Sequence, residues 1–277
     1  MARTISLAHS PDSDDAFMFC GLARGRVDPR GLAFAHHLAD IETLNRLALE
    51  GRHDVTALSF HAWPGVRRGY RLMTCGASVG DGYGPLVVSR RPLSPQDLDE
   101  CTVAVPGERT TAFLVLRLLS PSARWKVLPF DRVLEAVARG DADAGLVIHE
   151  GQMTYRDHRL HRVQDLGEWW RLETGLPLPL GALAIRRTLD DDTVRRCAEA
   201  VRDSVRFALE HREEALEWAL PFARGLDRAR TARFVGLYVN SQTLELGERA
   251  VQAVSLLYRL GHEAGLIPER VEPEFVG

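Results

Sequence analysis

A histidine follows a buried apolar segment in the middle of the chain, where it is placed to take part in proton transfer. Residues 144–148 form a short, continuous apolar run typical of a central parallel strand, and His149 and Glu150 come directly after it, before the helix breaker Gly151. Ligands of open α/β sheets bind at the carboxyl ends of the strands, and histidine exchanges protons near neutral pH. A structural histidine held by hydrogen bonds fits this position equally well. The segment lacks the second histidine of the zinc motif His-Glu-x-x-His, so we expect no metal here.

A second candidate site is the loop Gly107-Glu-Arg-Thr-Thr-Ala112, which connects a predicted strand with a predicted helix. The first amides of a helix have no partner inside it, and the helix dipole favours an anion at that end. Thr110 and Thr111 add hydroxyl donors, although a threonine here can also simply cap the helix. We therefore predict that Thr110, Thr111 and Ala112 bind the carboxylate of a small-molecule substrate.

The corresponding loop nearer the amino terminus, Ser10-Pro-Asp-Ser-Asp-Asp15, is acidic. Either Asp14 or Asp15 can cap the helix that we expect to begin at about Ala16, and we expect both to lie on an exposed polar loop. Three carboxylates so close together disfavour an anion and suit the hydroxyl groups of a substrate, and their spacing is unusual for magnesium. Ser10, Asp14 and Asp15 are therefore candidate substrate-binding residues.

Two pairs of short segments repeat along the chain. Thr4-Ile-Ser-Leu-Ala resembles Thr102-Val-Ala-Val-Pro, and Leu49-Glu-Gly-Arg-His-Asp54 resembles Ala138-Arg-Gly-Asp-Ala-Asp143. Because the two pairs recur in the same order, we predict two α/β lobes that share a strand–helix–strand–helix–strand plan.

The predicted architecture is two α/β lobes around a cleft. Residues 1–88 and 186–277 form the larger lobe, residues 89–185 form the smaller one, and two crossing strands act as the hinge. The last part of the chain carries apolar stripes with charged outer faces, so we expect its helices to pack on the larger lobe. A cleft of this kind usually holds a small molecule and can close on it. Ser59 ends the strand that corresponds to the one before His149, so both should face the cleft together with the two loops.

The composition is that of an ordinary globular protein, with 277 residues, 45% apolar and 26% charged. A net charge of −3 gives no electrostatic reason to bind nucleic acid or an anionic membrane. The single lysine, Lys126, disfavours P-loop phosphate binding and Schiff-base chemistry. The four cysteines form no Cys-x-x-Cys pair, which suits reduced thiols. No signal-peptide or membrane-spanning stretch follows Met1, so we expect a cytoplasmic protein.

Taken together, these motifs resemble the 1,4-dihydroxy-6-naphthoate synthase family of the futalosine route to menaquinone. The similar segments cover nearly the whole chain in order and include His9-Ser-Pro-Asp-Ser-Asp-Asp-Ala-Phe17, Asp40-Ile-Glu-Thr-Leu-Asn45, Gly82-Tyr-Gly-Pro-Leu-Val-Val88, Val105-Pro-Gly107 with Thr110-Thr-Ala112, Gly145-Leu-Val-Ile-His-Glu150 and Thr174-Gly-Leu-Pro-Leu-Pro-Leu-Gly181. The family is similar in fold to type II periplasmic binding proteins, so the resemblance implies the same two-lobed fold.

The resemblance also implies an activity. It implies a lyase that converts cyclic dehypoxanthinyl futalosine to 1,4-dihydroxy-6-naphthoate and releases a three-carbon sugar fragment, without a metal or organic cofactor. The family's catalytic histidine falls on His149, its anion site on Thr111 and Ala112, and its cleft serine on Ser59. In the first loop, members of the family often carry Cys-Pro-Asn-Asp where this chain has Asp-Ser-Asp-Asp. Because this loop should contact the ligand, the difference leaves the exact substrate open.

The implied reaction ends in an aromatic ring, so a proton must leave carbon or a hydroxyl group, and we predict that His149 is the general base. Exposed aspartates would be too weakly basic for this role. If the strand continues past the histidine, Glu150 points to the opposite face and is not expected to pair with the imidazole.

Two other functions fit the same fold. Chorismate dehydratase of the same pathway is one, although we would not expect the Ile-His-Glu strand end in it. A solute-binding protein for a small carboxylate is the other, and it would need a secretion signal or lipid anchor, which we do not expect in a chain that starts at Met1 in this way.

Overall fold

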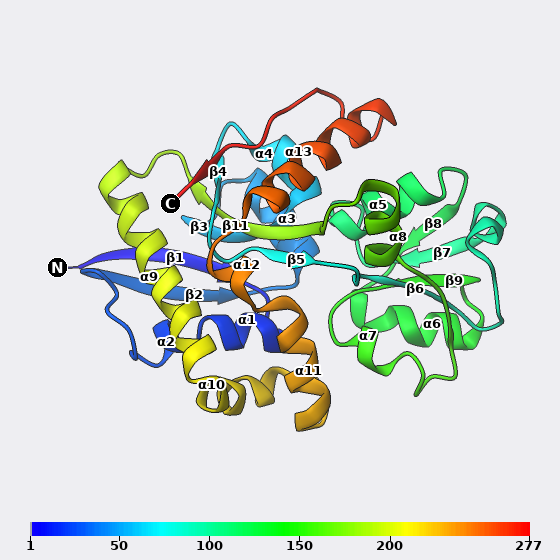
Figure 1. The fold of residues 1–277 in the computed structure, drawn as a ribbon, viewed down its shortest axis with the longest axis horizontal. Coiled ribbons are helices and arrows are strands. Elements are labelled where there is room, and N and C mark those ends of the chain that lie inside the picture. Colours follow the sequence, from blue (N-terminus) through cyan, green and yellow to red (C-terminus); the bar gives the residue numbers. More distant parts are fainter. Residues whose placement is uncertain (1) are drawn as a thin grey trace.

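Two sheets, one in each lobe, organise the chain in the computed structural model, which describes residues 2–277 (Figure 1). The first sheet has the strand order β12-β4-β11-β3-β1-β2, with β5 paired to β11, and the second has the order β10-β6-β9-β7-β8. The strands of the first sheet are β1 (Arg3–His9), β2 (Leu32–Leu38), β3 (Val55–Ser59), β4 (Tyr70–Met73), β5 (Ser78–Gly80), β11 (Leu178–Arg186) and β12 (Phe275–Val276). Those of the second are β6 (Leu86–Ser89), β7 (Thr102–Val105), β8 (Arg124–Val127), β9 (Ala144–Val147) and β10 (His161–Asp165). The predicted two-lobed α/β fold is confirmed.

The two sheets repeat one plan. In the first, β1 lies between β3 and β2 and is parallel to both; in the second, β7 lies between β9 and β8 in the same way. An antiparallel strand flanks each set, β11 beside β3 and β6 beside β9. The repeated segments of the sequence therefore predicted the topology correctly. The carboxyl ends of β1, β3, β7 and β9 all lead to one space between the lobes.

Helices cover the sheets of both lobes (Figure 1). The helices are α1 (Ser13–Met18), α2 (Cys20–Ala23), α3 (Ile41–Leu49), α4 (Trp63–Val66), α5 (Thr111–Leu119), α6 (Val133–Arg139), α7 (Gly151–Thr154), α8 (Leu166–Thr174), α9 (Asp191–Glu210), α10 (Arg212–Ala219), α11 (Arg228–Tyr238), α12 (Ser241–Leu244) and α13 (Glu248–Glu263). Short 3-10 turns, η1 to η4, occupy Phe60–Ala62, Pro95–Glu100, Phe130–Arg132 and Leu220–Phe222. Asp40 caps α3 by accepting a hydrogen bond from the Thr43 amide at 3.0 Å. Near the carboxyl terminus α12 ends at Leu244 and α13 begins at Glu248, so residues 245–247 separate the two helices.

The chain passes between the lobes twice. It leaves the first sheet after Gly80, enters the second at Leu86, and is back in the first at Leu178, so β6 lies in the smaller lobe a few residues before the predicted lobe boundary. One apolar core continues across these crossings and joins side chains of both lobes, such as Trp63 and Leu114. The lobes are thus connected by buried packing as well as by the crossing chain.

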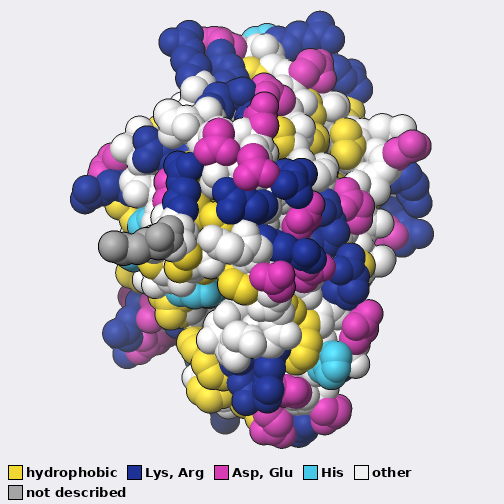
Figure 2. Space-filling view, turned by 90° about the vertical axis from the view of Figure 1, so that its left-hand side faces the viewer, with side chains coloured by type: hydrophobic (Ala, Val, Ile, Leu, Met, Phe, Trp, Pro, Cys, Tyr) yellow, Lys and Arg dark blue, Asp and Glu magenta, His cyan; other side chains and the backbone are white. Residues whose placement is uncertain are grey.

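Ion pairs cover the outer face of the longest helix, α9. Arg195 pairs with Asp192 at 2.6 Å and with Glu199 at 2.8 Å, and Arg206 pairs with Asp203 at 2.6 Å. Figure 2 shows basic and acidic side chains interspersed over this end of the larger lobe. Exposed pairs of this kind each contribute little stability. In the described part of the chain, no helix has both the length and the apolar character needed to cross a membrane.

Candidate active site

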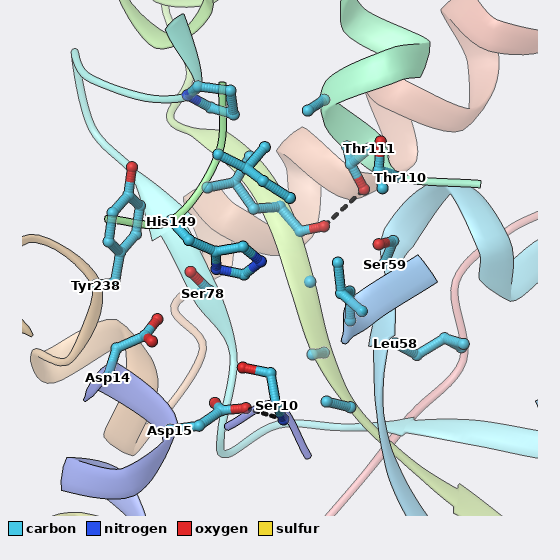
Figure 3. A pocket seen from close by; sticks show the side chains of 18 of the residues that line it. Ser10, Asp14, Asp15, Leu58, Ser59, Ser78, Thr110, Thr111, His149 and Tyr238 are labelled. Atoms are coloured by element: carbon cyan, nitrogen blue, oxygen red, sulfur yellow. Dashed lines mark hydrogen bonds between the residues drawn. The ribbon is translucent and has the colours of Figure 1, made fainter. Parts of the chain in front are cut away.

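A cavity lined by residues of both lobes lies between them (Figure 3). Every residue that the sequence singled out for a site lines this cavity: Ser10, Asp14, Asp15, Ser59, Thr110, Thr111, Ala112 and His149. The two loops and the two strand ends that carry them come from both lobes. The structure therefore places the predicted residues together, as expected for the carboxyl ends of equivalent strands.

His149 is held in a strained turn that directs its imidazole into the cavity. β9 ends at Val147, and His149 has a φ of +53°, which is uncommon for a residue with a side chain. Its Nδ1 lies 3.0 Å from Oδ2 of Asp12 in the other lobe. Its Nε2 is buried and has no hydrogen-bond partner among residues 2–277. One ring nitrogen thus lies beside a carboxylate, and the other has no hydrogen-bond partner in residues 2–277, while the side chain as a whole lines the cavity.

The prediction that strand alternation turns Glu150 away from His149 is wrong. The strand stops two residues before His149, and Glu150 adopts the helical conformation that starts α7. Both side chains therefore point to the larger lobe, where Oε1 of Glu150 accepts hydrogen bonds from the amide and the hydroxyl of Ser13 at 3.2 and 3.1 Å. Glu150 makes no hydrogen bond to the imidazole, which instead contacts Asp12.

Asp12, which the sequence did not single out, is the most enclosed carboxylate of the site, with 1% of its side chain exposed. Its Oδ1 accepts from Nε and Nη2 of Arg224 at 3.0 and 2.7 Å, and its Oδ2 accepts from the hydroxyl of Ser10 at 2.6 Å. Burial disfavours the ionised form, but His149, the Ser10 hydroxyl and Arg224 outweigh burial and lower the pKa of Asp12. The ionised form of Asp12 is therefore favoured, and its Oδ2 lies at ion-pair distance from Nδ1 of His149.

Asp14 and Asp15 are not exposed, contrary to the prediction. α1 begins at Ser13, three residues earlier than expected, and turns both side chains toward the cavity. Burial and the neighbouring carboxylates raise the pKa of Asp14 well above its usual value, and its Oδ1 has no partner in the described chain. Burial raises the pKa of Asp15 to about 6, and its Oδ2 accepts a hydrogen bond from the amide of Ser10 at 2.6 Å. The first loop thus presents carboxyl groups that favour the protonated form.

In the second loop the hydroxyl groups are used within the protein. Thr110 caps α5 by accepting from the Phe113 amide at 3.1 Å, and the Thr111 hydroxyl donates to the Leu180 carbonyl at 2.6 Å. The backbone amides of Thr111 and Ala112, in contrast, have no acceptor anywhere in residues 2–277. The anion-binding capacity predicted for this loop therefore rests on its amides, not on its hydroxyls.

The remaining predicted residue, Ser59, lies beside this loop. Its hydroxyl accepts from the side-chain amide of Asn45 at 3.0 Å, and its own amide donates to Asn45 at 2.9 Å. Thr110, Thr111 and Ser59 form one side of the cavity, while Asp14, Asp15 and Ser10 lie on the other, with His149 between them (Figure 3).

Two further lining residues, Gln152 and Tyr238, were not found from the sequence. The Tyr238 hydroxyl, from the larger lobe, donates to Oε1 of Gln152, in the smaller lobe, at 2.8 Å. Gln152 follows His149 at helical spacing, which is the only sequence signal that could have indicated it. Within the described residues, no three His, Cys, Asp or Glu side chains are grouped to hold a metal ion.

The site combines an apolar cavity, an imidazole with a free nitrogen, two unoccupied amides and a set of buried carboxyl groups. Such an arrangement can bind an anionic, hydroxylated molecule and remove a proton from it.

Comparison with known proteins gives consistent matches. The family model described as menaquinone biosynthesis matches residues 5–263. The chain is 43% identical to a protein named 1,4-dihydroxy-6-naphthoate synthase from Thermus thermophilus, over 99% of this chain and 100% of the relative. It is 40% identical to a protein of the same name from Streptomyces coelicolor, over 96% of each chain.

Two solved structures illustrate the fold. A protein from Archaeoglobus fulgidus is 46% identical and superposes with a TM-score of 0.92, over 95% of this chain and 98% of its own. An alkanesulfonate-binding protein from Xanthomonas axonopodis pv. citri, solved with MOPS, is only 13% identical but reaches a TM-score of 0.74, over 97% of this chain and 95% of its own. The second match shows that the fold is that of periplasmic binding proteins.

Proposed function

This chain belongs to the menaquinone biosynthesis family, and we propose that it acts there as a 1,4-dihydroxy-6-naphthoate synthase with His149 as its general base. It is a lyase, as its curated relatives are. Its proposed substrate is cyclic dehypoxanthinyl futalosine, which it converts to 1,4-dihydroxy-6-naphthoate with release of a three-carbon fragment.

The observation that carries the proposal is the environment of His149. His149 lines the cavity, its Nε2 is buried and unpaired in residues 2–277, and its Nδ1 lies 3.0 Å from Oδ2 of Asp12. The adjacent carboxylate favours a proton on Nδ1, and Nε2 then carries the lone pair that a general base needs. Neither the only lysine nor any cysteine lines the cavity, so no other strong base competes with it.

The two sides of the cavity suit the two ends of this substrate. The free amides of Thr111 and Ala112 at the start of α5 would hold its carboxylate. On the other side, Asp14 has a raised pKa, and a protonated carboxyl both donates and accepts hydrogen bonds. Asp14, Asp15 and Ser10 would thus bind the sugar-derived hydroxyl groups.

Purified protein should convert cyclic dehypoxanthinyl futalosine to 1,4-dihydroxy-6-naphthoate, detected by liquid chromatography and mass spectrometry, and should leave chorismate unchanged. His149→Asn should lower turnover by roughly 10²–10⁴, the usual worth of a positioned base. His158→Asn is the matched control, because His158 is exposed on the same lobe and does not line the cavity. Consumption of chorismate, or near-normal turnover by a folded His149→Asn protein, would contradict the proposal.

We also propose that the enzyme works in the cytoplasm. All four cysteines are free and buried, and free thiols persist in reducing compartments. Detection of the protein in the soluble fraction of its own cells, and not among exported proteins, would test this.

A further inference from the structure

The pair formed by His149 and Asp12 is divided between the two lobes. His149 follows β9 in the smaller lobe, whereas Asp12 follows β1 in the larger one, and the two atoms in contact are 3.0 Å apart. A contact of this length exists only while the lobes are as close as they are here.

The larger lobe holds Asp12 in place without help from His149. Arg224 donates two hydrogen bonds to Oδ1, and the Ser10 hydroxyl donates one to Oδ2. All of these partners belong to the larger lobe. The carboxylate is therefore already oriented when the imidazole reaches it, which limits the entropy that the contact costs.

The smaller lobe restricts the imidazole in turn. The ring of Phe130 meets that of His149 edge to face, with centroids 5.3 Å apart, and the guanidinium of Arg224 lies 4.5 Å from the centre of the same phenyl ring. Arg224 thus contacts both the acceptor of the imidazole and the ring beside it. These contacts leave Nε2 as the ring nitrogen without a partner in residues 2–277.

We propose that Asp12 is the positioning residue of the general base and that closure of the two lobes completes the base by bringing Asp12 to His149. This inference rests on the proposed function, in which His149 removes a proton from the substrate. The charge of Asp12 beside Nδ1 favours the tautomer with the proton on Nδ1, which leaves the lone pair on Nε2 for the substrate proton. When Nε2 takes the substrate proton, the imidazolium is balanced by the charge of Asp12, and Nε2 later returns the proton to product or water.

Other contacts also join the lobes along residues 149–157, but none of them reaches the imidazole. Glu150 accepts from Ser13, Gln152 from Tyr238, and Asp157 pairs with Arg230 at 2.6 Å. Asp157 is half exposed, and its contact is an ordinary surface ion pair. It offers a control in which the same change, aspartate to asparagine, is made at the same interface away from the base.

The test compares Asp12→Asn, His149→Asn, the double variant and the control Asp157→Asn, by kcat and KM with cyclic dehypoxanthinyl futalosine. Asp12→Asn should lower kcat by about 10²-fold or more with a much smaller change in KM, because its amide favours the wrong tautomer. It should cause no further loss in the His149→Asn protein, since it acts only through that side chain. A loss no larger than that of Asp157→Asn, or a full additional loss in the double variant, would overturn the inference.

A second measurement serves if Asp12→Asn does not fold. The ¹⁵N resonances of the imidazole nitrogens, assigned by their disappearance in His149→Asn, show which nitrogen carries the proton. In wild-type protein saturated with 1,4-dihydroxy-6-naphthoate, the proton should be on Nδ1. A proton on Nε2 would overturn the inference even if the enzyme is active, whereas wild-type protein that makes no naphthoate would refute the proposed function itself.

Discussion

Two loops of this protein occupy equivalent places and differ in charge. The loop after β1 leads into α1 and the loop after β7 leads into α5, and each follows the middle parallel strand of its sheet. In the first, the leading amide of the helix, that of Ser13, donates to Glu150 of the other lobe. The next two amides, those of Asp14 and Asp15, have no acceptor in residues 2–277. In the second, the leading amides, those of Thr111 and Ala112, are free within residues 2–277.

The difference shows how one backbone arrangement serves two purposes. Carboxyl groups supplied by the protein fill the first loop, so this side of the cavity offers an anion little, and one of them, Asp12, lies against His149. The second loop keeps its amides for an anion from outside. The duplicated plan gives the cavity a polarity, which fixes the direction in which an elongated substrate with one carboxylate can bind.

The largest effect is expected from making the second loop acidic like the first. Ala112→Asp would place a carboxylate at the free amides, and it should weaken binding of 1,4-dihydroxy-6-naphthoate by about 3 kcal/mol, or roughly 10²-fold, since like charges at a contact cost several kcal/mol. Calorimetric titration measures the change. Ala112→Asn has the same size without the charge, so equal losses in both variants would show that bulk and not charge is responsible.

Replacing Asp14 of the first loop by a neutral residue should change how the free energy of unfolding depends on pH. The pKa of Asp14 is raised in the folded protein, so the folded state holds a proton that the unfolded state loses above about pH 4. The contribution of Asp14 to stability therefore falls as pH rises from there. Asn cannot ionise, so Asp14→Asn removes the loss of stability at high pH. The variant should raise the free energy of unfolding at pH 7 by about 1–3 kcal/mol, which is the cost of a buried unpaired polar group. Urea denaturation at several pH values measures it.

The wild-type protein and Asp14→Asn must be compared at each pH, because His9 changes the free energy of unfolding with pH in the opposite direction. Burial and the nearby His36 lower the pKa of His9 to about 4, so its contribution to stability is lost as pH falls from about 6.5 through 4. His9 is the same in both proteins and cancels in the difference. A gain for Asp14→Asn that is as large at pH 4 as at pH 7 would contradict the assignment to Asp14.

Most of the fold was readable from local patterns. The repeated segments identified β1 with β7 and β3 with β9. Once those pairs are known, the rule that ligands bind at the carboxyl ends of strands is sufficient to bring His149 and the two loops to one cavity.

The features of the site that the sequence did not predict depend on contacts between residues far apart in the chain, or on the residue at which one strand ends. Arg224 lies 212 residues from Asp12, and no local pattern indicates that they meet. The orientation of Glu150 depends on where β9 stops, and a difference of two residues reverses the conclusion drawn from alternation. Asp14 looks polar and exposed in the sequence, but α1, which carries it, packs against α10 and α11, helices that lie far along the chain.

A smaller effect is expected at the hydroxyl of Thr111. It donates to the Leu180 carbonyl at 2.6 Å and accepts from the His61 amide at 3.1 Å, so it connects α5 with the crossing strand β11. Thr111→Val should lower the free energy of unfolding by about 1–2 kcal/mol, because both buried partners lose a hydrogen bond. Naphthoate affinity should change less, since the amide remains. Chemical denaturation of Thr111→Val measures the effect on stability, and calorimetric titration measures the effect on naphthoate affinity. A loss of affinity without a loss of stability would mean that the hydroxyl binds the ligand instead.

The smallest effect is expected at Thr110, and it tests whether the second loop is pre-formed for an anion. The Thr110 hydroxyl accepts from the Phe113 amide at 3.1 Å and donates to the Gly107 carbonyl at 2.9 Å, so it occupies one amide of α5 and holds the loop that leaves the two before it free. Thr110→Ala should cost about 1 kcal/mol of stability, the usual worth of a helix cap, and Thr110→Ser should restore it. Because the freed Phe113 amide is then a third donor at the same helix end, naphthoate should bind Thr110→Ala at least as well as Thr110→Ser once both are folded. Weaker binding by a folded Thr110→Ala protein would mean that the cap, rather than the amides alone, determines the geometry of the anion site.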